Sequence, residues 1–143
     1  MGVLRALTLA ALWWLCKSWA TVFADAGKAI VANRILAAGT EPNRIAWGTG
    51  AGTAVVGDTT LFSESADETR ATGSSSRVTV TITNDTYQVT GTMTAVTSPK
   101  TITNAGLFDA ASGGNMLIKG DFTGIPLGVG DSIAFTIRLR LGN

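Results

Sequence analysis

The chain has 143 residues, enough for one domain of ordinary size with an extension but too few for two full domains. Its 11 basic and 10 acidic residues leave a net charge of +1, which argues against affinity for phosphate backbones, so no nucleic-acid partner is expected. The absence of histidine and the single cysteine, Cys16, exclude histidine-based acid–base catalysis, cysteine–histidine pairs, the usual zinc sites and an intrachain disulfide.

The first 24 residues contain the most apolar stretch. Arg5 is followed by the apolar run ALTLAALWWL. Val22 and Ala24 occupy positions where a signal peptidase requires small residues, so the segment is similar in pattern to a secretory signal peptide. We expect it to be retained rather than cleaved. The run breaks at Lys17 and Ser18 after ten residues, whereas a membrane span needs about 20, so membrane insertion is not expected.

A helix over residues 4–15 would be apolar on nearly every side, and such a helix is normally buried. It could pack across its own β-domain, or it could be buried between subunits or in another protein. Three of the four tryptophans lie in the first 24 residues, and tryptophan is enriched at the energetic centres of interfaces. We therefore predict a subunit or attachment interface there. Its residues are Leu4, Leu7, Leu12, Trp13, Trp14, Leu15 and Trp19.

A second helix is predicted from Thr21 to Ala38, with Gly39 as its stop. From Thr40 the sequence changes to glycine, threonine and short apolar alternations. We assign residues 1–39 to a hydrophobic helical N-terminal extension, which serves as an anchor, and residues 40–143 to a β-sandwich domain.

After a short strand with Ile45 and Trp47 comes the glycine-rich stretch GTGAGT. It lacks the Lys-Ser or Lys-Thr of a phosphate loop, and Thr53 replaces the third glycine of a dinucleotide fingerprint, so we expect a mobile loop rather than nucleotide binding. Residues 60–69 are predicted to be a short helical or irregular piece. The acidic cluster in it is interpreted as a solvated face; its members are Glu64, Asp67 and Glu68.

Two hairpins and a final strand follow. Residues 78–83 and 87–93 alternate apolar and polar side chains around the turn Asn84-Asp85-Thr86, with residues 73–76 as a flexible loop before them. Residues 102–108 and 116–122 form the second hairpin, and residues 132–141 form the last strand. About six strands predict a mainly β fold, an antiparallel β-sandwich or a Greek-key or jelly-roll-like domain. The predicted core is Ile133, Phe135, Ile137, Leu139 and Leu141 with Val78, Val80, Ile82 and Leu107.

Catalytic candidates are few. One candidate group of catalytic carboxylates for glycoside cleavage consists of Asp109, Asp121 and Asp131. Each of them lies beside glycine or in a predicted turn, where aspartate has a structural role. Ser132 and the serines of residues 74–76 have no histidine partner for a nucleophilic triad. We therefore expect no enzyme, and predict no catalytic, cofactor-binding or metal-binding residue.

Three segments carry a resemblance: IAWGTG with GDTTLFSE, then ITNAGLFDAASGGNMLIKGDF, then IPLGVGDSIAFTIRLRL. They resemble small β-rich structural proteins of tailed bacteriophages, which are described as tail, fibre or head-decoration proteins. The resemblance covers Ile45 to Leu141, about two thirds of the chain. It is strongest at the AGLFDA hairpin and at the Gly-Asp-Ser before the last strand.

The resemblance implies a non-enzymatic structural protein of the virion, assembled in the host cytoplasm. An oligomeric β-domain would attach to the capsid or tail through the N-terminal helices, as a decoration, cement or fibre-type component. The expected partners are other virion proteins and further copies of the chain, with a host-surface glycan as a further candidate ligand.

Two alternatives remain open. One is a secreted or surface-anchored carbohydrate-binding β-sandwich that keeps its signal peptide. Sugar platforms usually use exposed aromatic side chains, and outside the extension the sequence offers Trp47, Tyr87 and a few phenylalanines. The other alternative is a membrane-anchored surface subunit, which requires residues 4–15 to lie in lipid.

Overall fold

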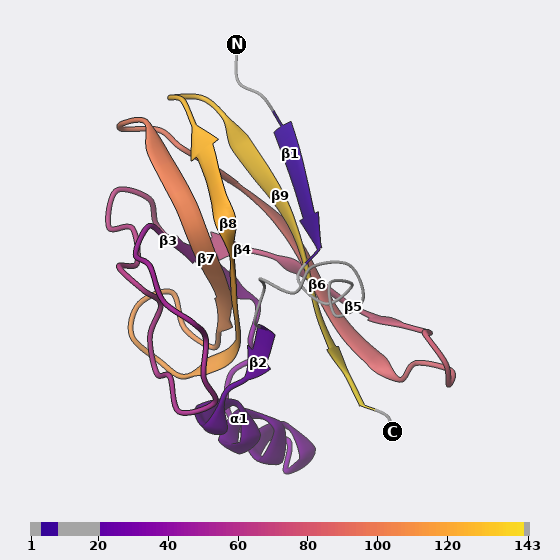
Figure 1. Ribbon diagram of the computed structural model, residues 1–143. Helices are drawn as coiled ribbons and strands as arrows, with labels where there is room; N and C mark the ends of the chain where they lie inside the picture. The colour runs from indigo at the N-terminus through magenta and orange to yellow at the C-terminus, as the bar shows by residue number, and fades with distance from the viewer. Residues whose placement is uncertain (1–3, 9–20, 142–143) are drawn as a thin grey trace.

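Two β-sheets face each other, and one helix lies at one end of them (Figure 1). The computed structural model describes residues 4–8 and 21–141, with side chains from residue 21 onward. Within this part the protein is mainly β, as predicted, and the arrangement is that of a β-sandwich. All strand pairs are antiparallel except β1–β9, which is parallel.

The first sheet, here called sheet I, has the order β1-β9-β6-β5. Its strands are β1 (Leu4–Thr8), β5 (Ser74–Val78), β6 (Thr86–Thr94) and β9 (Ser132–Arg140). The second sheet, sheet II, has the order β2-β8-β7-β3-β4. Its strands are β2 (Thr21–Phe23), β3 (Arg44–Gly48), β4 (Ala71–Thr72), β7 (Lys100–Phe108) and β8 (Met116–Leu127). The helix is α1 (Asp25–Ile35).

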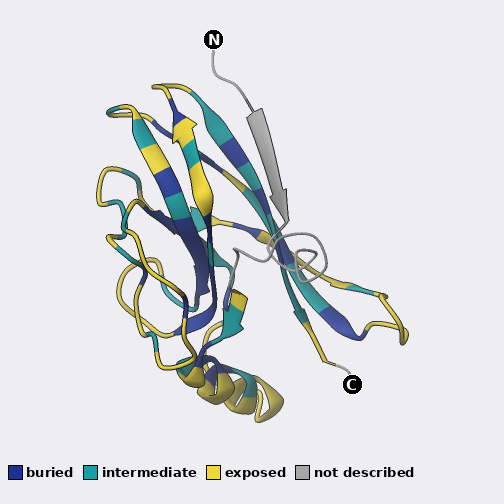
Figure 2. Ribbon diagram, viewed as in Figure 1, coloured by how far each residue is buried: buried dark blue, intermediate teal, exposed yellow. Residues whose placement is uncertain are grey.

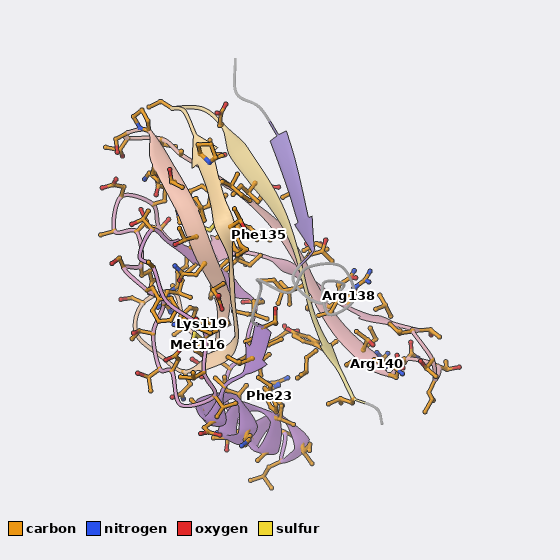
Figure 3. The ribbon with its side chains drawn as sticks, in the orientation of Figure 1. Phe23, Met116, Lys119, Phe135, Arg138 and Arg140 are labelled. Atoms are coloured by element: carbon orange, nitrogen blue, oxygen red, sulfur yellow. The ribbon has the colours of Figure 1, made fainter. Side chains whose placement is uncertain are left out.

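The core lies between the inner faces of the two sheets (Figures 2 and 3). Ile133, Phe135 and Ile137 on β9 are buried, as their alternation with polar residues predicted. The rings of Phe135 and Trp47 on β3 meet edge to face, with centroids 6.4 Å apart and an interplanar angle of 70°. Leu107 on β7 is also fully buried, so this part of the predicted core is confirmed.

Val78 and Leu139 are half-buried, and Leu139 packs against the core. The other three predicted core residues are not part of the core. Val80 and Ile82 are 51% and 65% exposed, and Leu141 is 61% exposed. The reason is local: the Asp85 carboxylate accepts hydrogen bonds from the backbone N–H groups of Val80, Thr81 and Ile82 at 2.9–3.1 Å, so these residues form a turn instead of a strand. The strand begins earlier, as β5, in the serines that we expected to be a flexible loop.

The N-terminal helices also differ from the prediction. Leu4–Thr8 forms strand β1, which runs beside β9 with Leu7 opposite Phe135, instead of the start of a helix. β2 replaces the first residues of the second predicted helix, and α1 begins only at Asp25. An available strand edge offers backbone hydrogen bonds that outweigh a weak local preference. Residues 9–20 lie outside the described part of the chain, so the prediction for them stays a prediction.

Helix α1 packs against β8 through a glycine. A Cβ atom at Gly27 would lie 2.7 Å from both the Leu117 carbonyl oxygen and the Phe23 ring, so a larger residue would push the helix away. The helix ends at Ile35 with Leu36 as its C-cap, and the next residue, Ala37, has a positive φ of 58°. Close packing at the start of α1 leaves its other end, with Ile35 and Leu36, exposed.

Candidate functional site

A loop between β3 and β4 covers the outer face of sheet II and is held there by polar side chains. Asn104 on β7 is fully buried; its Oδ1 accepts the backbone N–H of Phe62, and its Nδ2 donates to the Phe62 carbonyl, both at 3.0 Å. Asp121 lies opposite Asn104 on β8 and accepts the backbone N–H of Ala54 at 2.8 Å. The glycine-rich loop that we predicted to be mobile is therefore tied to the sheet at several points.

The same face holds a buried lysine. Lys119 is fully buried, and its Nζ donates to Asp58 Oδ2 at 2.8 Å and to the Thr60 carbonyl at 2.9 Å. The ammonium also lies 3.1 Å from the centre of the Phe62 ring. The hydrogen bond from Lys119 is the main reason that the pKa of Asp58 lies below its ordinary value. With two oxygens and a ring around it, this lysine fastens the loop instead of serving as a nucleophile.

The predicted solvated acidic face is partly internal. The side chains of Glu68 and Lys100 are nearly buried and form an ion pair at 2.6 Å. Glu68 also accepts hydrogen bonds from Ser65 Oγ at 2.8 Å and from Trp47 Nε1 at 3.2 Å. Burial alone would raise the pKa of Glu68, but the hydrogen bonds outweigh it and hold the pKa below its ordinary value. This cluster joins strands β3 and β7 to the connection between β3 and β4.

The three aspartates considered for catalysis lie in different places. Asp109 accepts the backbone N–H of Asn115 at 2.7 Å in the β7–β8 turn. Asp131 accepts the backbone N–H of Gly128 at 2.8 Å in the β8–β9 turn. These turn roles agree with the prediction, whereas Asp121 lies within strand β8. Among the described residues, no group of three or more acidic, cysteine or histidine side chains is arranged to hold a metal ion.

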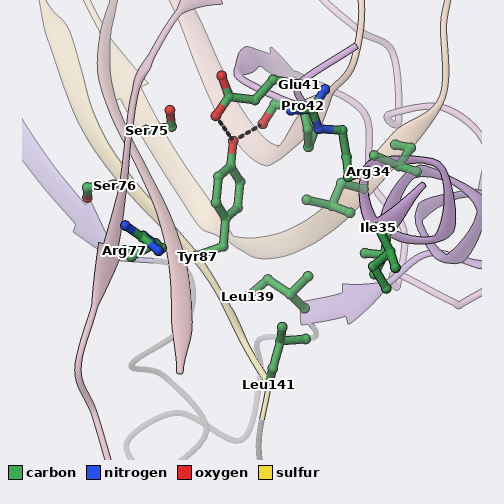
Figure 4. A pocket seen from close by; sticks show the side chains of 13 residues that line it. Arg34, Ile35, Glu41, Pro42, Ser75, Ser76, Arg77, Tyr87, Leu139 and Leu141 are labelled. Atoms are coloured by element: carbon green, nitrogen blue, oxygen red, sulfur yellow. Dashed lines mark hydrogen bonds between the residues drawn. The ribbon is translucent and has the colours of Figure 1, made fainter. Parts of the chain in front are cut away.

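The best candidate site is a groove at the helical end of the sandwich (Figure 4). It has a volume of about 530 Å³, within the range typical of ligand pockets. Helix α1 and the turn before β3 form one side, and strands β5, β6 and β9 form the other. Its apolar lining residues are Ile30, Val31, Ile35, Pro42, Leu117, Leu139 and Leu141.

Polar groups occur at defined points of this groove. The Tyr87 hydroxyl donates to the Pro42 carbonyl at 2.9 Å and lies 3.3 Å from Glu41 Oε1, as Figure 4 shows. Burial, and next the negative charge of Glu41, raise the pKa of the Tyr87 phenol, so it remains a neutral donor. Arg34 donates to the Gly39 carbonyl at 3.0 Å. Arg77 lines the groove from β5, and no carboxylate of residues 21–141 forms an ion pair with it.

The sequence did not predict this groove. The residues predicted as an attachment interface include Leu4 and Leu7, which lie on β1, while Leu12, Trp13, Trp14, Leu15 and Trp19 lie outside the described residues. The groove combines side chains from residue 30 to residue 141, and no local pattern connects them. The only sequence signal is a weak one, the apolar pair Ile35 and Leu36 at the end of α1. Gly27 and Ile30 are the residues that α1 buries in the domain, so this pair is not needed there.

Comparison of the chain with protein-family models, with curated proteins and with solved structures finds no match. In the part of the chain that the structure describes, no helix has the length and apolar character needed to cross a membrane.

Proposed function

We propose that the chain is a non-enzymatic structural subunit of a tailed-phage virion, of the capsid-decoration, tail or fibre type. In this proposal the β-domain associates with copies of itself and with other virion proteins, and the N-terminal segment contributes to attachment. The finer fold assignment, a Greek-key or jelly-roll-like sandwich, is part of the same proposal. The virion identity itself rests on the sequence resemblance of residues 45–141.

One structural observation supports the non-enzymatic part most directly: two ionisable side chains buried in the domain, Lys119 and Glu68, are occupied by structural contacts. Lys119 is engaged by Asp58, a carbonyl and a ring, and Glu68 is engaged by Lys100, Ser65 and Trp47. A general acid or base must reach a proton of the substrate, and these buried groups have no such access. Lys119 and Glu68 thus fix loops.

The carbohydrate-binding alternative receives less support. Trp47, the aromatic side chain outside the N-terminal segment best suited to a sugar platform, is buried in the core. The large hydrophobic side chains that are exposed among the described residues are all aliphatic. A sugar platform needs an exposed aromatic face, so this alternative depends on residues outside the described part.

The test is to locate the protein in particles. An antibody against residues 40–143 should label virions of the phage that encodes the chain, and the label should occupy one repeated position in electron micrographs. The purified protein should show neither polysaccharide turnover nor saturable ATP binding. Absence of the protein from purified particles, or polysaccharide turnover that is lost in an Asp121→Asn variant, would contradict the proposal.

A further inference from the structure

Sheet I ends in an edge strand that no other described strand covers. β5 pairs with β6 on one side only, and its first four residues, Ser74 to Arg77, are exposed. Natural edge strands are usually protected by proline, lysine, a bulge or very short length. The edges of sheet II are short, since β2 has three residues and β4 has two, whereas β5 has five residues and contains neither proline nor lysine. Among the strands of residues 4–8 and 21–141, none pairs with the outward backbone groups of β5, so these groups can pair with a further strand.

This edge borders the groove. Three consecutive residues of β5, Ser75, Ser76 and Arg77, line it. Because successive side chains of a strand point to opposite faces, three successive lining residues place the groove at the edge of the strand, not on one face. Aliphatic side chains continue the surface, with Ile35 83% exposed and Leu141 61% exposed. An apolar surface beside an unpaired strand edge is typical of a protein-binding surface.

The charges on this surface have both signs. Glu41 accepts the Tyr87 hydroxyl, and Arg77 lies on β5; among residues 21–141 neither of the two forms an ion pair. A surface with one unpaired charge of each sign complements a second copy of itself, because a twofold axis brings each charge to its opposite. The net charge of +1 adds little repulsion between copies.

We propose that the β5 edge and the adjoining groove bind a second copy of this chain, with the two β5 strands antiparallel about a twofold axis at Ser76. In that register Ser75 lies opposite Arg77 of the second copy, so the two arginines never face each other. Ser75, Tyr87 and Glu41 all line the groove, where Glu41 Oε1 lies 3.3 Å from the Tyr87 hydroxyl. In this arrangement Arg77 of the second copy enters the groove that holds Glu41, and each copy completes the ion pair of the other.

The proposal deepens the self-association named under the proposed function and rests on that part of it. In the proposed dimer, β5 pairs with β5 of the second copy, so sheet I continues across the twofold axis into sheet I of the second copy. The groove then becomes an internal channel of the dimer, walled by α1 on one side and by the continued sheet on the other.

The first experiment is sedimentation velocity of the full chain over a range of concentrations. A dimer is expected, and Arg77→Glu and Glu41→Arg should each weaken self-association about tenfold or more, since each places like charges together. The double variant Arg77→Glu/Glu41→Arg should recover most of the affinity, because the reversed charges again oppose each other. The matched control is Arg138→Glu. Arg138 lies on the outer face of sheet I, where it donates to Gln88, and its replacement should leave association unchanged.

The second experiment is crosslinking, which does not depend on charge. In a Cys16→Ser background, Ser76→Cys should form a disulfide-linked dimer on mild oxidation, because directly opposite residues of antiparallel strands have Cα atoms about 4.5–5.5 Å apart. Val129→Cys, which is also exposed but lies in the β8–β9 turn, should not crosslink.

The outcomes separate the inference from the proposed function. A chain that stays monomeric at every concentration contradicts both the inference and the self-association part of the function. If the chain forms an oligomer whose affinity is unchanged by both charge reversals and which does not crosslink through residue 76, only the inference is contradicted. Saturable binding of dodecanoate to a monomer, lost in Arg77→Gln, would assign the groove to a small amphiphilic anion and would also overturn the inference.

Discussion

The outer face of sheet II and the β5 edge of sheet I differ in whether other described segments cover them and in whether their polar groups are paired. The outer face of sheet II is covered by residues 49–62, and its polar side chains, among them Asn104 and Lys119, have their hydrogen-bonding groups satisfied within the chain. No described strand pairs with the outer edge of β5, and Arg77 on this strand has no acidic partner among residues 21–141. Buried polar groups here fix structure, while Arg77 on the β5 edge belongs to the surface that we propose binds a second copy.

The largest expected effect lies in the core that both regions share. Phe135→Ala should lower the free energy of unfolding by about 3–5 kcal/mol, because it removes a fully buried ring packed on Trp47. Urea denaturation followed by tryptophan fluorescence measures this. The control is Ile82→Ala in the exposed β5–β6 turn, which should change stability by less than about 0.5 kcal/mol. Equal losses in both variants would show that the assignment of core and turn is wrong.

Lys119→Met tests the covered face of sheet II. The variant keeps most of the side-chain volume but leaves the Asp58 carboxylate and the Thr60 carbonyl without their donor, at a cost of about 1–3 kcal/mol. Relative to the original chain, the variant should show faster amide hydrogen exchange in residues 54–62, and the increase in β9 should be smaller. Lys28→Met, which removes the exposed ion pair with Asp25, is the control and should be nearly neutral. Unchanged exchange in the loop would mean that the lysine does not fasten it.

Gly48→Ala tests how closely the loop approaches the sheet. A Cβ atom at Gly48 would lie 2.4 Å from the Phe62 carbonyl oxygen, so the backbone must shift, at a cost of about 1–3 kcal/mol. Gly57 is in the same loop and has no atom within 4 Å of the corresponding position, so Gly57→Ala should be nearly neutral. A thermal melt compares the two variants. If Gly57→Ala is the more harmful change, the loop does not lie as described.

The smallest effect concerns pH. The pKa of Glu68 in the folded protein lies below the ordinary value of 4.5, so its carboxylate form is favoured by folding. This contribution is fully present above 4.5 and is lost as the pH falls through that value towards the lower folded pKa. Glu68→Gln should therefore be less stable than the original chain at pH 7, and the difference should shrink at pH 3. A difference that grows on acidification would contradict the direction of the shift.

Asp58 and Asp85 contribute in the same direction. Each has a folded-state pKa below its ordinary value, Asp58 through its hydrogen bond from Lys119, and Asp85 because the N–H groups of Ile82, Val80 and Thr81 outweigh the effect of burial. The whole domain should therefore lose stability on acidification.

The sequence alone determined the β7–β8 hairpin and the core face of β9. In both, the evidence is local: apolar and polar residues alternate, and the β7–β8 turn contains Gly113 and Gly114, which adopt positive φ values of 61° and 70°. Alternation and turn chemistry act within a few residues, so they can be seen without a fold. The same reasoning predicted a mainly β protein, and the structure confirms it.

The other features depend on contacts between segments that are distant in the sequence. Leu4–Thr8 is a strand because β9 offers it an edge, and the serines of β5 form a strand because β6 lies beside them. Lys119 is buried because a loop some 60 residues away in sequence brings Asp58 to it. The groove and the β5 edge likewise depend on segments that meet only in the folded chain. Hydrogen-bond partners and burial depend on which residues are close in space. The sequence shows only which residues are adjacent along the chain.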